Sequence, residues 1–364
     1  MILNLYIARR FLLALAMVFA ATVGIALLID MVEQLRRFGG SPLGLGGAFQ
    51  MALLRLPASL YMVLPLMVML ATLALFLRLG RSSELVVARA SGRSALHFVA
   101  APALAALLVG GLALALFNPI VAATSTQYDE RSARIAGGDD SVLSVGRDGL
   151  WMREAIEEGQ RVIHAQHASG YGARLFDVTF LTFAQGTGPV SRIDAAVALL
   201  TPGAWELRDA KQWQLGATNP ERESAAHDVL SLATDLDESR VRDGFSTPGS
   251  VGIWQLPAFI DALEQAGLSA REHRVWLHME LAMPLFLSAM VLVGAAFTMR
   301  HPRAAHRGLL VLAALLSGFA AFFLRNLAQV LGENGHIPAA LAAWSPPIIA
   351  LLLAMALLLH LEEG

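Results

Sequence analysis

The sequence contains no cysteine and a single lysine. The missing cysteine excludes disulfide bonds, thiolate metal sites and a cysteine nucleophile, although it does not fix the compartment. The one lysine, Lys211, is followed by Gln212, so the chain holds no Gly-Lys-Ser/Thr phosphate-binding loop. Any energy from ATP would therefore have to come from a partner chain.

Charge is also scarce, and it is unevenly spread. Charged residues make up 15% of the 364 residues and apolar residues 56%, whereas soluble proteins carry about 25% charge. Of the 56 charged residues, 36 fall within residues 121–274 and 20 in the remaining 210. The formal net charge of −2 argues against a nucleic-acid binder, which would carry a basic patch. The composition predicts a membrane chain with one large water-facing insert.

Six apolar runs are long enough to cross a bilayer as helices, which takes about 20 residues. A cleaved secretory signal is the alternative for the first run, but that run exceeds the roughly 7–15 apolar residues of a signal, and five more runs follow. Apart from Arg325, the runs offer few polar groups. They cover residues 11–29, 56–77, 95–117, 281–299, 308–324 and 339–359.

The short loops gather arginine on one side of a six-span arrangement. Lysine and arginine are retained in cytoplasmic loops, so this side should be cytoplasmic, with both termini on it and residues 120–275 outside. The arginines that set this orientation are Arg9, Arg10, Arg78, Arg81, Arg89, Arg93, Arg300, Arg303 and Arg307.

The insert alternates apolar and polar residues in short runs, as at 176–183, and Gly- and Pro-rich turns separate the runs. This pattern is typical of an antiparallel sandwich or jelly roll. We therefore expect an α-helical membrane protein with six transmembrane helices, three on each side of an inserted periplasmic all-β, jelly-roll-like domain. The expected parts are helices one to three (1–119), the β domain (120–254), an amphipathic helix beside the membrane (255–270) and helices four to six (271–364).

No catalytic or metal-binding motif stands out. The ten histidines have no His-Glu-x-x-His spacing, and His164 and His167 lie three apart in an expected strand, on opposite faces. A Gly-x-Ser-x-Gly nucleophile elbow is also missing from the sequence. The sequence favours a protein that is not an enzyme and needs no cofactor or metal.

A short helix is expected between the second and third runs, over about residues 82–92. The serines at its start can cap it, Glu84 complements the dipole of its first turn, Arg89 suits its last turn, and Gly92 can adopt a left-handed conformation after its end. Two interpretations stay open. The helix inserts into a groove of a cytoplasmic partner, or it rests on lipid headgroups.

Residues 83–92 resemble the Ser-Glu-Leu-x-x-x-x-Ala-x-Gly signature of the lipopolysaccharide-export permeases LptF and LptG. The similarity covers essentially the whole chain, including the order of three spans, β insert and three spans. Residues 30–37 look more like the LptG members, and an LptF-type subunit is the alternative. Further segments that carry the resemblance are Tyr6–Phe11, Tyr61–Leu66, Gly149–Trp151, Trp205–Leu207 and Ala342–Pro346.

This resemblance implies a function and a set of partners. Members of the family pair as an LptF–LptG heterodimer, bind two copies of the ATPase LptB, and extract lipopolysaccharide from the outer leaflet of the inner membrane. Their periplasmic domains hand the lipid towards LptC and LptA. The resemblance thus implies a transport subunit in the inner membrane of a Gram-negative bacterium, with Glu84, Leu85 and Arg89 in the ATPase groove.

A multi-acyl anionic lipid needs cations near the outer membrane surface beside an apolar wall. A charged side chain within or near an apolar span either takes part in function or extends to the lipid headgroups. Asp30 departs from the family, because LptG members can carry a lysine there. Either Asp30 pairs with a nearby arginine, or the lipid carries different anionic groups, or the segments do not align. The expected lipid-binding residues are Arg36, Arg37, Arg55, Arg131, Arg134 and Arg325.

The competing interpretation is a membrane-anchored scaffold whose β domain binds periplasmic proteins. A scaffold would have no reason to dock a nucleotide-driven subunit at Glu84. Mechanotransmission permeases of the MacB or LolC type are a further alternative, but they place a large domain after the first of four spans. The chain has three spans on each side of its insert instead.

Overall fold

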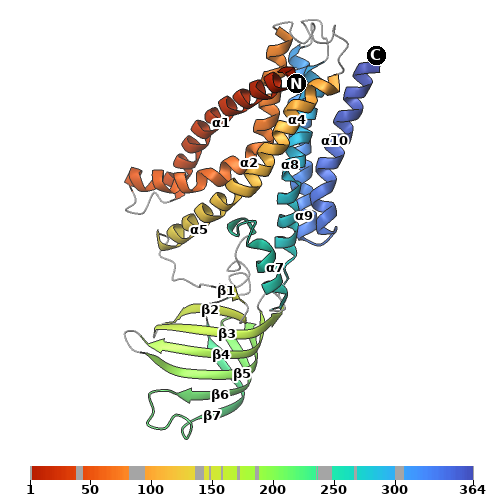
Figure 1. Cartoon of the computed structure of the whole chain (residues 1–364). Coiled ribbons are helices and arrows are strands. Elements are labelled where there is room, and N and C mark those ends of the chain that lie inside the picture. The colour runs from red at the N-terminus through yellow and green to blue at the C-terminus, as the bar shows by residue number, and fades with distance from the viewer. Residues whose placement is uncertain are drawn as a thin grey trace. The chain divides into compact units, whose positions relative to one another are not determined.

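The computed structural model describes most of the chain as helices and strands in two units (Figure 1). One unit comprises Met1–Tyr128 and Arg274–Gly364, and the other Asp129–His273. The described residues are 2–37, 44–81, 95–135, 143–146, 149–156, 159–169, 173–184, 188–234, 236, 248–265, 269–299 and 307–363. The helices are α1 (Ile2–Arg37), α2 (Gly44–Arg81), α4 (Ala95–Leu112), η1 (Ala113–Phe117), α5 (Asn118–Ile135), η2 (Pro248–Ser250), α7 (Leu256–Gln265), α8 (Arg271–Thr298), α9 (Arg307–Glu333) and α10 (Ala339–Glu363).

Six helical segments among the described residues are long and apolar enough to cross a membrane, with α4, η1 and α5 forming the third. Three lie on each side of the β insert, so the predicted three-plus-three arrangement is confirmed. The second helix begins at Gly44, well before the expected start at 56, and it continues through Pro57 and Pro65. Membrane helices tolerate internal proline where neighbouring helices and side chains satisfy the freed backbone groups.

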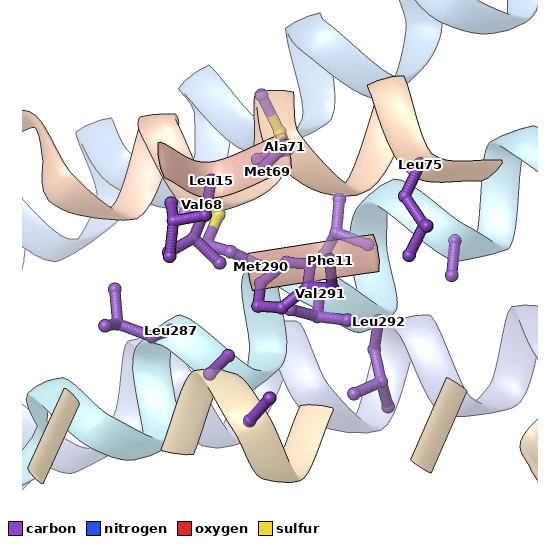
Figure 2. Close-up of a cluster of buried hydrophobic side chains, with 14 of the residues drawn as sticks. Phe11, Leu15, Val68, Met69, Ala71, Leu75, Leu287, Met290, Val291 and Leu292 are labelled. Atoms are coloured by element: carbon purple, nitrogen blue, oxygen red, sulfur yellow. The ribbon is translucent and has the colours of Figure 1, made fainter. Parts of the chain in front are cut away.

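The first unit has central and peripheral helices. In the most apolar windows of α2 and α8, 67% and 72% of residues are buried, against 11% in those of α1 and α9. Figure 2 shows the core where α1, α2 and α8 meet, with Phe11, Met69 and Met290 among the buried side chains. The peripheral helices leave large apolar side chains exposed, as a lipid-facing surface requires.

One glycine marks a close approach between α4 and α8. A Cβ added to Gly110 would lie 2.5 Å from the Cα of Pro284, closer than side chains pack. Membrane helices often pack through such small residues, which let their backbones come together. Ser288 supports the same contact, because its hydroxyl donates a 3.0 Å hydrogen bond to the carbonyl of Ala103.

The second unit contains one antiparallel sheet, which confirms the predicted all-β insert. Among the described strands, each pairs only with its neighbours in sequence, so the sheet is a meander without the crossover of a jelly roll. Alternate side chains fill one face, including Ile163, Phe180 and Trp205. The strands are β1 (Leu143–Gly146), β2 (Gly149–Ile156), β3 (Gly159–Ser169), β4 (Arg174–Ala184), β5 (Pro189–Thr201), β6 (Ala204–Gln214) and β7 (Ala225–Ala233).

A bend crosses the sheet at two aspartates. Asp177 and Asp209 both have φ of 51°, a conformation that aspartate tolerates better than bulky residues. The ladder has no bridging pair at either residue, and each lies opposite Ala196 of β5. Next to them the buried positions are three apart instead of two, as at Leu175 and Val178. The bend therefore keeps apolar residues on the buried face on both of its sides.

Three polar side chains are buried with this face, and we call them the Glu154 cluster: Glu154, Arg161 and Thr234. An Arg161 Nη1 donates to Glu154 Oε1 at 2.5 Å and to the carbonyl of Ala233 at 3.0 Å. The hydroxyl of Thr234 donates to Glu154 Oε2 at 2.6 Å. The cluster thus ties β2 and β3 to the chain that leaves β7.

The expected amphipathic helix is present as α7. Its apolar residues Leu256, Ile260 and Leu263 are buried, whereas Trp254, just before it, is 72% exposed. Placement of this segment beside the membrane stays a prediction.

Candidate functional site

Asp30 lies in a polar cluster that joins α1 to α2. Its carboxylate is 7% exposed and accepts a 3.0 Å hydrogen bond from the hydroxyl of Ser59. The Nε of Arg55 lies 3.9 Å from its other oxygen. Of the alternatives that the sequence leaves open for Asp30, the structure thus shows pairing with a nearby arginine.

Tyr128 of α5 connects the remaining members of this cluster. An Arg37 Nη1 donates to the hydroxyl of Tyr128 at 3.2 Å, and that hydroxyl donates to Gln34 Oε1 at 3.2 Å. The guanidinium of Arg55 lies over the Tyr128 ring, 5.9 Å from its centre. We call these residues the Asp30 cluster: Asp30, Gln34, Arg37, Arg55, Ser59 and Tyr128.

The predicted arginines thus fall into different settings. Arg37 and Arg55 meet in the Asp30 cluster. Arg36 is bonded to Glu33 at 3.0 Å, and 79% of its side chain is exposed. Arg131 is exposed on α5, and the side chain of Arg134 lies outside those that the structure describes. Tyr128 is not predicted from the sequence, although a lone tyrosine at the polar end of an apolar helix is a usable signal.

Arg325 belongs to a separate polar group in the membrane-spanning unit. Its guanidinium lies over the ring of Phe286, 5.7 Å from the centre, and it interacts electrostatically with Glu280 and Tyr61. Glu280, in α8, is 1% exposed. The Tyr61 hydroxyl donates a short hydrogen bond to its Oε2.

Asn118 completes this group, which we call the Glu280 cluster: Tyr61, Asn118, Glu280 and Arg325. The Asn118 side chain hydrogen-bonds to both Tyr61 and Glu280. Asn118 directly follows the π-helical turn η1 and precedes Pro119, which has no amide hydrogen to continue an α-helical ladder. Such π turns often occur at functional sites.

The Glu280 cluster corrects the expectation that only Arg325 brings polarity into the spans. The expected fourth run begins at Leu281, which left Glu280 at its edge. Helix α8 begins at Arg271 instead, so Glu280 lies within the span and is buried. An acidic residue beside a long apolar run was the signal that could have revealed it.

An apolar groove is lined by helices of the same unit. Its volume is about 430 Å³, and it includes Leu60, the neighbour of Ser59. Every lining side chain is apolar, and the lining comes from α1, α2, α4, η1 and α5: Leu12, Leu15, Ala16, Phe19, Leu60, Leu64, Val109, Leu112, Ala113, Leu116, Phe117 and Ile120. The Asp30 cluster and the apolar groove thus share helices α1, α2 and α5, and on α1 the groove lining ends at Phe19, eleven residues before Asp30.

None of the residues expected to contact an ATPase, Glu84, Leu85 and Arg89, is among the described residues. Within the described part of the chain, no group of three or more His, Asp or Glu side chains is placed to hold a metal ion. His164 instead stacks on Trp151, with ring centres 4.2 Å apart.

Six candidate spans among the described helices, two buried polar clusters between them and an inserted sheet define a multi-span membrane protein with a β unit. The model of the family "Lipopolysaccharide export system permease LptF/LptG" matches residues 5–360, and the chain belongs to this family. It is 24% identical over 360 residues to LptG of Escherichia coli K12, covering 98% of this chain and 95% of the relative. It is 23% identical over 358 residues to LptG of Haemophilus influenzae, covering 95% of each. The chain is accordingly a transport permease subunit of the bacterial inner membrane.

Proposed function

We propose that the chain is an LptG-type subunit that pairs with an LptF-like paralogue and extracts lipopolysaccharide from the inner membrane. The two relatives named LptG support this choice over an LptF-type subunit. A dimer of an LptB-like ATPase supplies the energy, and LptC-like and LptA-like bridge proteins receive the lipid. The chain itself contributes no catalysis and binds no nucleic acid.

The single observation that carries the proposal is the Asp30 cluster on the same three helices, α1, α2 and α5, that contribute to the apolar groove. Two guanidinium groups suit the phosphates of lipid A, because arginine binds phosphate through paired hydrogen bonds. The groove offers an uninterrupted apolar lining for acyl chains. Exposed side chains on α1 such as Leu28 and Val32 extend the apolar surface. An anionic lipid with several acyl chains fits this combination.

The proposed orientation follows from the arginines of the short loops. Both termini lie in the cytoplasm, and the β unit lies in the periplasm. The proposed parts keep the boundaries predicted from sequence: 1–119, 120–254, 255–270 and 271–364. The helix expected at 82–92 faces the ATPase, and Glu84, Leu85 and Arg89 make its contacts.

The proposed lipid contacts are the arginines near the outer ends of the spans. Arg36, Arg37 and Arg55 act together, because the last two meet at Tyr128. Arg131 and Arg134 are further candidates on α5. Arg325 is the last candidate, and its charge also interacts with Glu280.

Co-purification in mild detergent tests the whole proposal, with mass spectrometry of the proteins and lipids that elute. Recovery of an ATPase, a second six-span subunit and lipid A supports it. Recovery of the chain with periplasmic proteins alone, across several gentle detergents, supports the scaffold instead.

Two charge reversals then test the proposed ATPase contact and the proposed lipid contacts separately. Glu84→Arg is expected to abolish ATPase association while leaving lipid A binding intact. Replacing Arg36 and Arg37 together by glutamate is expected to do the opposite, without lowering the unfolding temperature. A scaffold would keep its assembly in both variants, and unchanged lipid affinity would remove Arg36 and Arg37 from the site.

A further inference from the structure

The Asp30 carboxylate and the Arg55 guanidinium are held unequally. Asp30 is anchored by the 3.0 Å hydrogen bond from Ser59, and 10% of its side chain is exposed. Arg55 is 42% exposed, and its Nε lies 3.9 Å away, beyond the 2.7–2.9 Å or so of a charge-assisted hydrogen bond. The pair is therefore Coulombic without being hydrogen-bonded, and part of the Arg55 side chain stays accessible on one side of the pair.

A lipid phosphate at that accessible side would compete with Asp30 for the same cation. A phosphate group carries about −1.5 to −2 charge and three acceptor oxygens, whereas a carboxylate carries one charge. The phosphate can thus draw Arg55 from Asp30, but it must overcome their attraction. The carboxylate also repels the incoming phosphate, so both effects weaken lipid binding.

Gln34 gives the released carboxylate a second partner. Its side chain is fully buried, and its Nε2 has no hydrogen-bond partner in the described part of the chain. Gln34 lies four residues after Asp30 on α1, and residues at this spacing face each other on a helix. A carboxylate that leaves Arg55 therefore has an amide donor one helical turn away.

We propose that Asp30 is a release residue, which competes with the phosphate of a bound lipid for Arg55 and recaptures the guanidinium when the lipid leaves. This inference rests on the proposed function, because it takes Arg55 as a lipid contact. An exporter must let go of its substrate, and binding that is too tight would slow release. Asp30 acts through Arg55 and so is a positioning residue.

The test measures binding of lipid A with two phosphates, and of the same lipid A after enzymatic dephosphorylation, to the full chain in detergent micelles. Asp30→Asn is expected to bind the phosphorylated lipid about fivefold more tightly, the factor that a partly exposed ion pair supplies. Most of the change should be slower dissociation. Binding of the dephosphorylated lipid should not change, which a merely structural role for Asp30 would not explain.

The double variant provides the decisive comparison. Arg55→Gln is expected to weaken binding of phosphorylated lipid A by roughly tenfold, since a charged contact is lost and Asp30 is left unpaired. Adding Asp30→Asn to it should restore part of this loss, because the repelling carboxylate is gone. Asp228→Asn, which neutralises an exposed carboxylate of β7 outside the Asp30 cluster, is the matched control and should stay near wild type. Unfolding temperatures of all variants check the fold.

The outcomes separate the inference from the proposed function. If Arg55→Gln weakens binding but Asp30→Asn neither tightens it nor rescues the double variant, Asp30 is no release residue and Arg55 remains a lipid contact. The inference is also overturned if Asp30→Asn changes binding of both lipids equally. If Arg55→Gln leaves binding of the phosphorylated lipid unchanged, Arg55 itself leaves the site.

Discussion

The Glu280 cluster and the Glu154 cluster are both buried groups of polar side chains, but the first connects helices and the second connects strands. Glu280 gathers groups from α2, α5 and α9, and its partner Tyr61 is 219 residues away in sequence. Glu154 bonds Arg161 on the adjacent strand and Thr234 just after β7. The strands are already held by backbone hydrogen bonds, whereas the described membrane-spanning helices have no backbone hydrogen bonds between them.

This difference shows in which unit polar contacts contribute most to stability. Helices in a membrane gain little from hiding apolar surface, because the surrounding lipid is equally apolar, so packing and interhelical hydrogen bonds decide their association. In the sheet, the ladder and the apolar face supply most of the stability. We therefore expect losses in the Glu280 cluster to exceed matched losses in the Glu154 cluster.

The largest effect is expected for Glu280→Ala. The change leaves the Tyr61 hydroxyl and the Asn118 amide without their acceptor and Arg325 without its opposite charge. Breaking a buried charged group in this way costs about 3–5 kcal/mol of unfolding free energy. Thermal unfolding in detergent measures it, and Glu280→Gln, which keeps an acceptor oxygen, is the control. Equal stability of the alanine and glutamine variants would contradict this role.

Arg161→Met should cost about 3 kcal/mol in the second unit, because it leaves the Glu154 carboxylate buried with only the Thr234 hydroxyl as donor. Loss of strand signal in circular dichroism during chemical unfolding measures it. The double variant Glu154→Leu with Arg161→Met should recover most of the loss, since apolar residues of similar size often replace a buried ion pair without cost. A double variant less stable than the single one would show that the pair stabilises the sheet.

Removing single hydroxyl groups sharpens the comparison at a smaller scale. Tyr61→Phe takes one donor from a charged acceptor and should cost about 1.5–3 kcal/mol. Thr234→Val removes a donor from Glu154, which stays bonded to Arg161, and also removes the acceptor of the Leu236 N–H. Its cost should be about 1.5 kcal/mol, at the lower end of that range. Thermal unfolding ranks the two, and the reverse order would contradict the comparison.

The smallest effect is expected at Glu221, on the exposed side of the second unit. The Lys211 ammonium and the Trp213 indole N–H both donate to its carboxylate and hold the pKa of Glu221 below its usual value of 4.5. Because the folded-state pKa is lowered, this stabilisation is present above pH 4.5 and is lost as the pH falls through the lowered pKa. The stability difference between wild type and Glu221→Gln should therefore shrink on acidification, which unfolding curves between pH 6 and pH 3 would detect.

The spans and the insert could be predicted from sequence because each follows a local sequence pattern. Apolar runs near 20 residues and alternating runs between turns need no partner to be recognised. The bend at Asp177 and Asp209 could not, since both residues sit inside otherwise regular strands. Their left-handed backbone is visible only in the structure.

The candidate site was predictable in part. Arg37 and Arg55 stand out because they lie near the outer ends of the spans, whereas most arginines of the short loops lie on the cytoplasmic side. Their contacts with Tyr128 depend on how three helices pack, which the sequence does not reveal. The pairing of Asp30 with Arg55 joins residues on separate helices, so no spacing rule reveals it. Glu280 was missed because its partners come from distant parts of the chain.

The discontinuous first unit also constrains how the protein is made. Its second part begins at Arg274, so the ribosome delivers Tyr61 and Asn118 to the membrane long before Glu280. The intervening sheet can assemble hairpin by hairpin, because every strand pairs with the previous one, and such local contacts form fast. Tyr61 and Asn118 must wait without Glu280, the partner that they share, until α8 arrives. Completion of the Glu280 cluster is thus a late step of biogenesis, and a chain truncated before α8 would be left as a substrate for membrane quality control.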